Sequence, residues 1–330
     1  MKKLGESRLN SRFKLKFISV LAASMVIMGG LFGCDTESDD PPQTSEPAAY
    51  PMTITDHADR TVTISAEPTK IISLVPSHTE IVFELGLGDK IVGVDDYSDY
   101  PAAALTTPKV GNLYGVNYEA IVAKTPDMIL VDISAVGLGV VAQLAAVMPD
   151  AAIIVAKGTS VGSFQEVYET IDLIGKVTNT GDAADTIVEE MKARVKAITD
   201  KTSGLTSANK PRIVYIIWPE PMYVYGGHAI GSALIEAAGG TNIFADNQGD
   251  AVQLEELVSR NPQVILASAS EAMGDYAYQF ALSDTRLDTT DAKIDGAIYG
   301  MNDDFTGRPG PRLIDGLEEM AKLLHPELFT

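Results

Sequence analysis

Short runs of apolar, often β-branched residues recur along the chain, and segments with a helical period separate them. Such runs predict buried strands, because both faces of a parallel sheet are covered. Between the strands, helices are predicted at 79–85 and 117–124. Strands and helices that alternate in this way predict an α/β fold with parallel sheets. The predicted strands are 71–75, 90–94, 128–131, 152–155 and 213–217.

Polar residues mark the starts of two helices. Ser77 with Glu80, and Ser163 with Glu166, have the spacing of a capping box, in which each side chain bonds the other residue's amide. Ahead of the first strand, apolar and polar residues alternate over 52–64. This alternation, interrupted by a polar turn, predicts a small β-hairpin.

Residues 182–201 predict one long helix in the middle of the chain. Six apolar residues lie on one stripe at helical spacing, and Glu190 and Arg194 are placed to pair across one turn. A helix of twenty residues is about 30 Å long. It divides the chain into two α/β halves, predicted at 50–178 and 205–330, with 179–204 as the link.

The two halves share an internal repeat. Residues 117–130 (NYEAIVAKTPDMIL) match residues 253–266 (QLEELVSRNPQVIL) without a gap. Each copy predicts a helix, a proline and a strand. Each predicted helix begins with a glutamate, Glu119 or Glu255. One such unit is common in α/β folds, so chance similarity is the alternative to two like lobes.

The N-terminus has the layout of an exported protein. A basic segment precedes residues 17–32, which carry no charge, and Cys34 follows. This arrangement predicts a signal peptide over 1–33. Residues 34–49 are rich in Pro, Ser, Thr and acidic residues, so they predict a solvated tether. An uncleaved anchor or a buried thiol is the alternative for this region.

Composition and charge narrow the function further. The chain has 330 residues, 45% of them hydrophobic, which is enough for about two domains with real cores. With 25 basic against 45 acidic residues its net charge is −20, which argues against nucleic-acid binding. A single cysteine excludes a disulfide framework and a cysteine-based metal site.

Several motifs together resemble the substrate-binding lipoproteins of ABC importers, in the two-lobed class with one rigid linking helix. The resemblance is greatest to the cobalamin-binding and iron–siderophore-binding branch. It implies a monomer with a ligand cleft between the lobes and lipid on Cys34, which would tether the protein outside the cytoplasm. The motifs are 72–80 (ISLVPSHTE), 94–101 (VDDYSDYP), Val110-Gly111 with Asn117 and Glu119, Pro126-Asp127, 218–223 (WPEPMY), 239–244 (GGTNIF) and 308–312 (RPGPR).

The resemblance implies a metal chelate as ligand, a cobalt corrinoid or else a ferric siderophore or haem, and no cofactor of the protein itself. Residues just after strands are the expected contacts, because ligands of parallel sheets bind at the carboxyl ends of strands. Leu113 and Asp132 fall where the best-known cobalamin binder has tryptophans. The candidate contacts are Ser77, His78, Tyr97, Leu113, Tyr114, Asp132, Trp218, Tyr223, His228, Asp303, Asp304, Phe305 and Arg308.

Some candidates keep a second interpretation. His78, His228 and Asp303 could hold a metal ion together, but a surface or capping role is favoured for each histidine. Arg308 could bind an anionic group of the ligand, whereas Arg312 is expected to pair or cap at the helix over 313–324. Each aromatic candidate could instead pack in the core.

Enzymatic activity is not expected. Adjacent Ser and His residues do not make a triad, and the chain has no Gly-x-Ser-x-Gly elbow, dinucleotide fingerprint or Walker loop. An exported chelatase-like or hydrolytic enzyme, or a purely structural lipoprotein, remains the alternative. The partner that the resemblance implies is a dimeric permease, whose arginines would contact Glu119 and Glu255.

Overall fold

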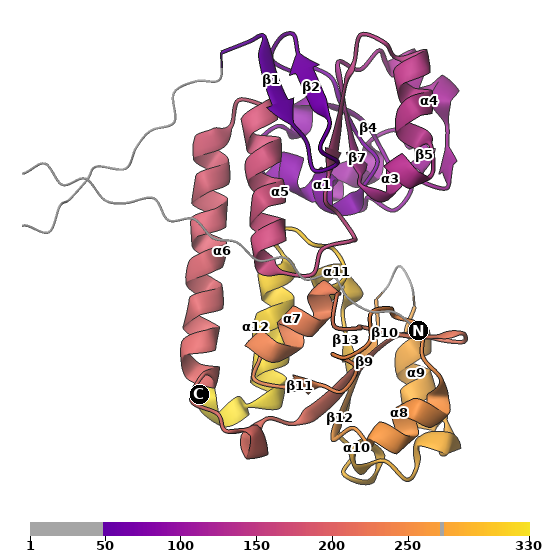
Figure 1. The fold of residues 1–330 in the computed structure, drawn as a ribbon, viewed down its shortest axis with the longest axis vertical. Coiled ribbons are helices and arrows are strands. Elements are labelled where there is room, and N and C mark those ends of the chain that lie inside the picture. The colour runs from indigo at the N-terminus through magenta and orange to yellow at the C-terminus, as the bar shows by residue number, and fades with distance from the viewer. Residues whose placement is uncertain (1–48, 271–273) are drawn as a thin grey trace, which may run out of the picture. The chain divides into compact units, whose positions relative to one another are not determined.

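The computed structural model describes residues 49–270 and 274–330. The predicted signal peptide, Cys34 and the tether up to residue 48 lie outside the described residues. Within them the chain builds two α/β lobes joined by one long helix, which confirms the predicted fold class (Figure 1). No helix in this part of the chain is both long and apolar enough to cross a membrane.

The first lobe is built around a parallel four-stranded sheet in the order β4-β3-β7-β8. These strands are Ile91–Val94, Ile71–Ser73, Met128–Asp132 and Ala152–Ala156. The predicted hairpin forms as β1 (Met52–Thr55) and β2 (Thr61–Ile64), and β5 (Gly111–Asn112) and β6 (Gly115–Val116) form a second one. The helices are α1 (Pro76–Glu84), α2 (Tyr118–Lys124), α3 (Ser134–Gly137), α4 (Val140–Val147) and α5 (Phe164–Val177).

The predicted capping box at α1 is wrong. The helix begins at Pro76, after Val75 at the N-cap, and no side chain caps it. Proline suits the first helical position, because its missing N–H would have no partner there in any case. Glu80 is therefore free to reach the other lobe. The second predicted box forms only in part. Ser163 Oγ accepts a hydrogen bond from the Glu166 amide at 3.3 Å, but the Glu166 carboxylate accepts one from the Gly162 amide at 2.7 Å and not from the Ser163 amide.

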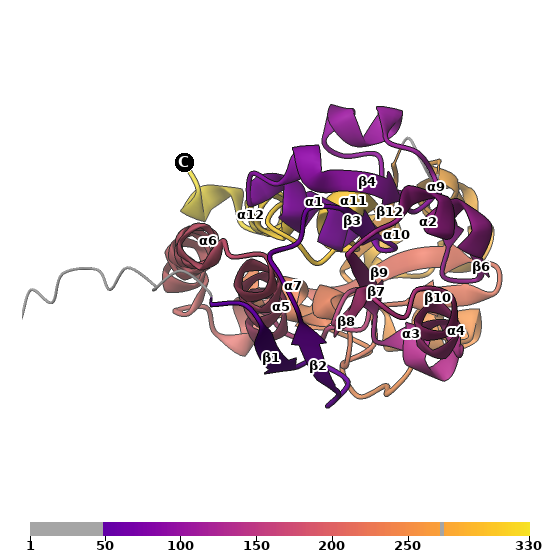
Figure 2. The same ribbon diagram turned by 90° about the horizontal axis from the view of Figure 1, so that it is seen from above.

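The predicted long helix is α6, which spans Gly181–Thr202. Its buried stripe includes Ala184, Val188 and Met191, as the spacing predicts. Helices α5 and α6 lie side by side in both views of the ribbon (Figures 1 and 2). One hydrophobic cluster runs from the first lobe through α5 and α6 into the second lobe. Helix α6 therefore belongs to the core of both lobes.

The predicted Glu190–Arg194 pair within α6 is wrong. Arg194 instead reaches across to α12 (Leu313–Leu324), where it bonds Asp315 at 2.6 Å and Glu318 at 2.9 Å. Two carboxylates on the neighbouring helix match the fork of a guanidinium better than one on the same helix. These pairs tie the linking helix to the last helix of the second lobe.

The second lobe has a sheet in the order β10-β9-β12-β13, with β11 also paired to β9. Strands β9, β11, β12 and β13 are parallel, and β10 is antiparallel. The strands are β9 (Arg212–Pro219), β10 (Met222–Val224), β11 (Thr241–Asn242), β12 (Val264–Ser268) and β13 (Ile298–Met301). The helices are α7 (Ile230–Ala237), α8 (Leu254–Arg260), α9 (Tyr276–Ser283), α10 (Asp291–Ile294), α11 (Asp303–Thr306) and α12.

The internal repeat has the same local geometry in both lobes. Helices α2 and α8 end at residues in the left-handed conformation, Thr125 and Asn261. Asp127 then accepts a hydrogen bond from the Lys70 amide at 3.0 Å, and Gln263 accepts one from the Arg212 amide at 3.1 Å. In each lobe the repeat thereby fixes the start of the neighbouring strand, β3 or β9.

Candidate ligand-binding site

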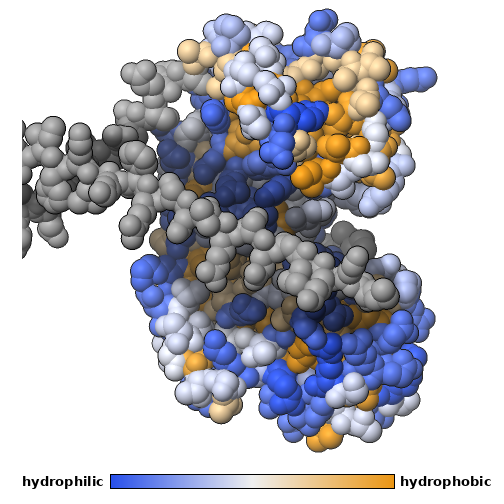
Figure 3. Space-filling view, in the orientation of Figure 1, coloured by the Kyte–Doolittle hydropathy of each residue, from blue (hydrophilic) through white to orange (hydrophobic). Residues whose placement is uncertain are grey.

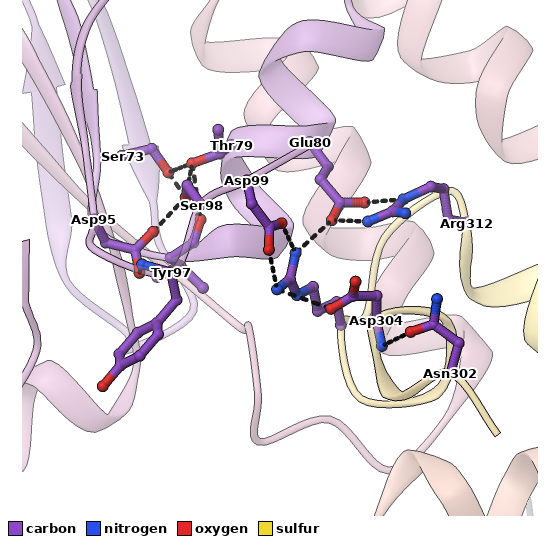
Figure 4. Close-up of polar contacts among 12 residues, drawn as sticks. Ser73, Thr79, Glu80, Asp95, Tyr97, Ser98, Asp99, Asn302, Asp304 and Arg312 are labelled. Atoms are coloured by element: carbon purple, nitrogen blue, oxygen red, sulfur yellow. Dashed lines mark hydrogen bonds and ion pairs between the residues drawn. The ribbon is translucent and has the colours of Figure 1, made fainter. Parts of the chain in front are cut away.

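The loop after β4 is held by a buried polar network in the first lobe. Asp95 follows the strand directly, and its carboxylate accepts hydrogen bonds from the Tyr97 amide at 3.1 Å and from the Ser98 hydroxyl. Thr79 Oγ1, on α1, lies 2.8 Å from Ser98 Oγ and 2.9 Å from Ser73 Oγ (Figure 4). Burial raises the pKa of the Asp95 carboxyl. The network fixes the backbone of the loop before any ligand arrives.

Tyr97 presents its ring outside this network. The side chain points away from the bonded polar groups (Figure 4), and the residue is 61% exposed. An aromatic face with few rotamers that stands on a rigid loop is a preformed contact surface for a flat apolar group. The structure thus places Tyr97 at the carboxyl edge of the first sheet, as the sequence predicts.

Aromatic residues also gather at the second sheet. Tyr223 on β10 pairs with Trp218 on β9, and Tyr276 at the start of α9 lies 5.2 Å from Trp218 between ring centroids. Tyr223 and Tyr276 are both exposed, and Trp218 donates its indole N–H to the Glu220 carbonyl. Sequence reasoning missed Tyr276, which begins α9 after strand β12.

The first lobe adds apolar surface beside its strand ends. Helix α3 directly follows β7, and Val136 and Leu138 there are exposed. The space-filling view shows apolar residues gathered on this lobe over α3 and α4, whereas the surface over α8 and α10 is largely polar (Figure 3). Sequence reasoning missed these two residues because an apolar residue after a strand ordinarily indicates core.

Two arginines of the second lobe join carboxylates of the first. Arg312 bonds Glu80 through two nitrogens, at 2.8 and 2.6 Å, and its guanidinium lies 3.7 Å from the centroid of the Tyr100 ring. Arg308 bonds Asp99 through both terminal nitrogens. The hydrogen bonds from Arg308 lower the pKa of Asp99. The carboxyl ends of the two sheets therefore face each other.

Three predicted contact residues are buried within the first lobe. His78 is fully buried, with Nε2 at 3.0 Å from the Lys157 carbonyl oxygen, and burial lowers its pKa. Asp132 is also fully buried and accepts hydrogen bonds from the Ser134 and Thr159 amides. Both side chains fix backbone at strand ends and present no polar atom to a ligand in this conformation. Ser77 is buried as well, and its hydroxyl has no partner among the described residues.

The remaining predicted contacts fall into three groups. Tyr114 and His228 are exposed, and His228 Nε2 lies 3.7 Å from the Asp250 carboxylate. Asp304 instead bonds Arg308 at 2.8 Å, and the Phe305 ring lies 5.2 Å from Arg312. Leu113 packs against the core of the first lobe, and Asp303 is partly buried, with Oδ1 unbonded among the described residues.

Metal-ligand geometry is absent from the described residues. Nowhere in 49–270 or 274–330 do three or more His, Cys, Asp or Glu residues come together as a metal site. His78 and His228 do not share a site. The His78 ring bonds the Lys157 carbonyl, and the His228 ring lies beside Asp250.

The two repeat glutamates occupy equivalent exposed positions. Glu119 and Glu255 are each the second residue of their helix, α2 or α8. Neither carboxylate has an ion-pair partner within the described part of the chain. A depression of about 240 Å³ adjoins Glu255 and is lined by Leu254, Val258 and Arg286. A carboxylate near a helix N-terminus is favoured by the helix dipole, so both sites are stable as exposed charges.

Comparisons with known proteins agree with this architecture. The chain is 31% identical over 324 residues to an uncharacterized ABC transporter substrate-binding lipoprotein of Bacillus subtilis, covering 95% of this chain and 99% of the relative. It is 29% identical over 325 residues to a cobalamin-binding protein of Halobacterium salinarum, covering 95% and 85%. The solved structure of a periplasmic vitamin B12-binding protein of Vibrio cholerae matches with a TM-score of 0.64 and 25% identity, covering 78% of this chain and 97% of that one.

A family model described as periplasmic binding protein matches residues 71–305, from the first buried strand of the first lobe to α11 of the second. With two α/β lobes, facing strand ends and this match over most of its length, the chain belongs to the periplasmic binding protein family.

Proposed function

We propose that this protein is the extracytoplasmic substrate-binding protein of an ABC importer and that it binds a corrinoid between its lobes. The observation that carries the ligand class is the exposed Tyr97 ring on a loop that buried hydrogen bonds hold rigid. A corrin ring is broad and flat, so a preformed aromatic face binds it with little loss of side-chain entropy.

Support also comes from the opposite lobe and from the relatives. Trp218, Tyr223 and Tyr276 supply aromatic surface at the second sheet, which suits a ligand held between two lobes. The Halobacterium relative and the Vibrio structure are named as cobalamin and vitamin B12 binders. A ferric siderophore or haem is the second candidate, because Leu113 and Asp132 leave the first lobe without further aromatic faces at those positions.

An enzymatic role finds no support at the Ser77-His78 pair. Both residues are buried, and the His78 ring is bonded to a backbone carbonyl rather than to the serine. A nucleophile needs its base within hydrogen-bond reach and a route to substrate. We therefore propose binding without chemical change, and recovery of unaltered ligand after incubation tests it.

The proposed partners are the membrane and a dimeric permease. Lipid on Cys34 would tether the receptor as a monomer on the outer side of the cytoplasmic membrane, in keeping with the name of the Bacillus relative. Glu119 and Glu255 would contact one permease subunit each, because they stand at equivalent exposed positions in the two lobes.

Ligand titration tests the binding site directly. Absorbance spectra of the purified protein with cyanocobalamin, a ferric siderophore or haem should show a saturable change with cyanocobalamin alone. Tyr97→Ala and Trp218→Ala should each weaken its binding by about 1–3 kcal/mol, the scale for a buried aromatic contact. Calorimetric titration measures the loss.

The matched control is Ile294→Ala. Ile294 is 69% exposed and ends α10. It lies before strand β13, at the amino ends of the strands and away from the proposed ligand contacts. Its removal should leave affinity unchanged. Unchanged affinity in both aromatic variants would move the ligand away from these strand ends, and a saturable change with haem or the siderophore would reassign the ligand.

A further inference from the structure

Arg308 lies between the lobes with its guanidinium already occupied. Both terminal nitrogens bond Asp99, one of them also lies 2.8 Å from Asp304, and the other is 3.6 Å from Glu80. The arginine side chain is only 13% exposed. A guanidinium that faces three carboxylates has little capacity left for an anionic group of a ligand.

Asp99 belongs to the same loop as Tyr97. Within the first lobe the loop is held at its start, where the Asp96 amide bonds the Gly111 carbonyl and the Tyr97 amide bonds Asp95. Beyond Ser98 the loop is held by side chains of the other lobe: Arg308 pairs with Asp99, and the Arg312 guanidinium lies over the Tyr100 ring. The loop is therefore fixed from both sides of the cleft.

We infer that Arg308 is a positioning residue, which acts through Asp99 to hold the Tyr97 loop in place from the opposite lobe. A bidentate guanidinium–carboxylate pair fixes orientation as well as distance, which a single charge contact does not. Loops that lose such anchors open locally without unfolding the domain. The positioning role does not depend on the proposed function. Only the identity of the ligand that the Tyr97 ring contacts rests on it.

Hydrogen exchange tests the inference without ligand. In Arg308→Gln and in Asp99→Asn, amides 96–98 should exchange about tenfold faster than in the wild-type protein, since local opening loses one anchor. Arg308→Lys should give a smaller increase, because an ammonium keeps the charge but not the fork. Exchange at wild-type rates in both Arg308→Gln and Asp99→Asn would overturn the inference.

Arg286→Gln is the matched control. Arg286 makes a similar pair with Asp284, which lies between α9 and β13 and outside the Tyr97 loop. Its loss should leave amides 96–98 unchanged. Equal acceleration in this variant would show a general loss of stability and would count against positioning by Arg308.

A double variant separates action through Asp99 from independent action. Arg308→Gln with Asp99→Asn should exchange no faster than either single variant, because residues that act through one contact are not additive. Additive acceleration would mean that Arg308 holds the loop by another route, and it would contradict the inference. Asp99→Asn also keeps the test available should Arg308→Gln fold poorly.

Cyanocobalamin affinity then tests the consequence for binding. Arg308→Gln should raise the Kd for cyanocobalamin about tenfold in the wild-type background. In a Tyr97→Ala background it should leave the Kd unchanged, since residues in one chain of contacts are coupled. A full loss in the Tyr97→Ala background would show direct contact of Arg308 with the ligand and overturn the inference. If the wild-type protein binds no cyanocobalamin, the proposed ligand fails while the exchange rates still decide the role of Arg308.

Discussion

At the scale of single residues, the contact between the lobes depends on a buried charge. Glu80 has a side chain only 3% exposed, the lowest exposure of the carboxylates that face Arg308 and Arg312. Burial raises the pKa of Glu80, and its hydrogen bonds with Arg312 oppose this shift. The carboxylate is therefore tolerated in its charged form because a fork of donors meets it.

Removal of Arg312 should reveal the free-energy cost of burying the Glu80 charge. Arg312→Met should lower the free energy of unfolding by about 3 kcal/mol at neutral pH, because it leaves Glu80 buried with only the more distant Arg308. Arg312→Met with Glu80→Met should recover most of the loss. Urea unfolding of the single and double variants measures both changes. An equal loss of stability in the two would exclude the uncompensated Glu80 charge as its cause.

The pH dependence of the Arg312→Met variant follows from the direction of the Glu80 shift. Loss of Arg312 raises the folded-state pKa of Glu80 further above its ordinary value of 4.5. A group whose folded pKa is raised destabilises above that pKa, and the cost disappears as the pH falls toward 4.5. The difference between wild type and variant should therefore shrink on acidification.

At the scale of elements, the internal repeat supplies two helices that differ in their caps. Asn117 accepts a hydrogen bond from the Ala120 amide at 3.0 Å and caps α2. Gln253 stands at the equivalent position before α8 and makes no side-chain cap. The same supersecondary unit thus uses a local side-chain bond in one lobe and none in the other.

This difference predicts unequal effects of one substitution. Asn117→Ala should lower the free energy of unfolding by about 1 kcal/mol, the usual cost of a lost N-cap. Gln253→Ala, its matched control, should change stability by only a few tenths of that amount. Denaturant unfolding of the two variants measures the difference. Equal losses would indicate that the Asn117 bond contributes nothing beyond solvation.

At the scale of the whole molecule, the lobes share a core, and each has an exposed glutamate as the second residue of its repeat helix. Helix α6 packs against α5 and α12, and one hydrophobic cluster joins both lobes through it. A spine of this kind keeps the exposed glutamates of α2 and α8 at a set separation. The proposed docking on a two-fold permease requires one such contact for each lobe.

Docking predicts a transport defect without a binding defect. Glu119→Ala with Glu255→Ala should leave ligand affinity unchanged but slow uptake in vesicles that contain the permease, more visibly at low salt, since screening weakens exposed pairs. Glu189→Ala with Glu190→Ala on α6 removes the same charge and should not slow uptake. Full uptake by the first double variant at low salt would exclude the docking role.

The sequence by itself determined the four strands of the first sheet, β9 and the long helix of this protein, because burial of one face or both faces leaves a regular pattern in the residues. The hairpin at 52–64, the Ser163 cap and the stripe of α6 follow from such local signals. Position after a strand also predicted that Tyr97 lies at the carboxyl edge of the first sheet, since the carboxyl ends of parallel strands meet at one edge.

Only the tertiary structure decided which polar residues face outward and which charges meet. His78 follows β3 and Asp132 ends β7, but both are buried and bond backbone groups of residues 157–159, whereas Tyr97 after β4 is exposed. Glu80 lies at capping-box spacing yet pairs with Arg312, which is 232 residues away in the sequence. Such pairs carry no local signal, because long side chains reach whichever partner the fold places beside them.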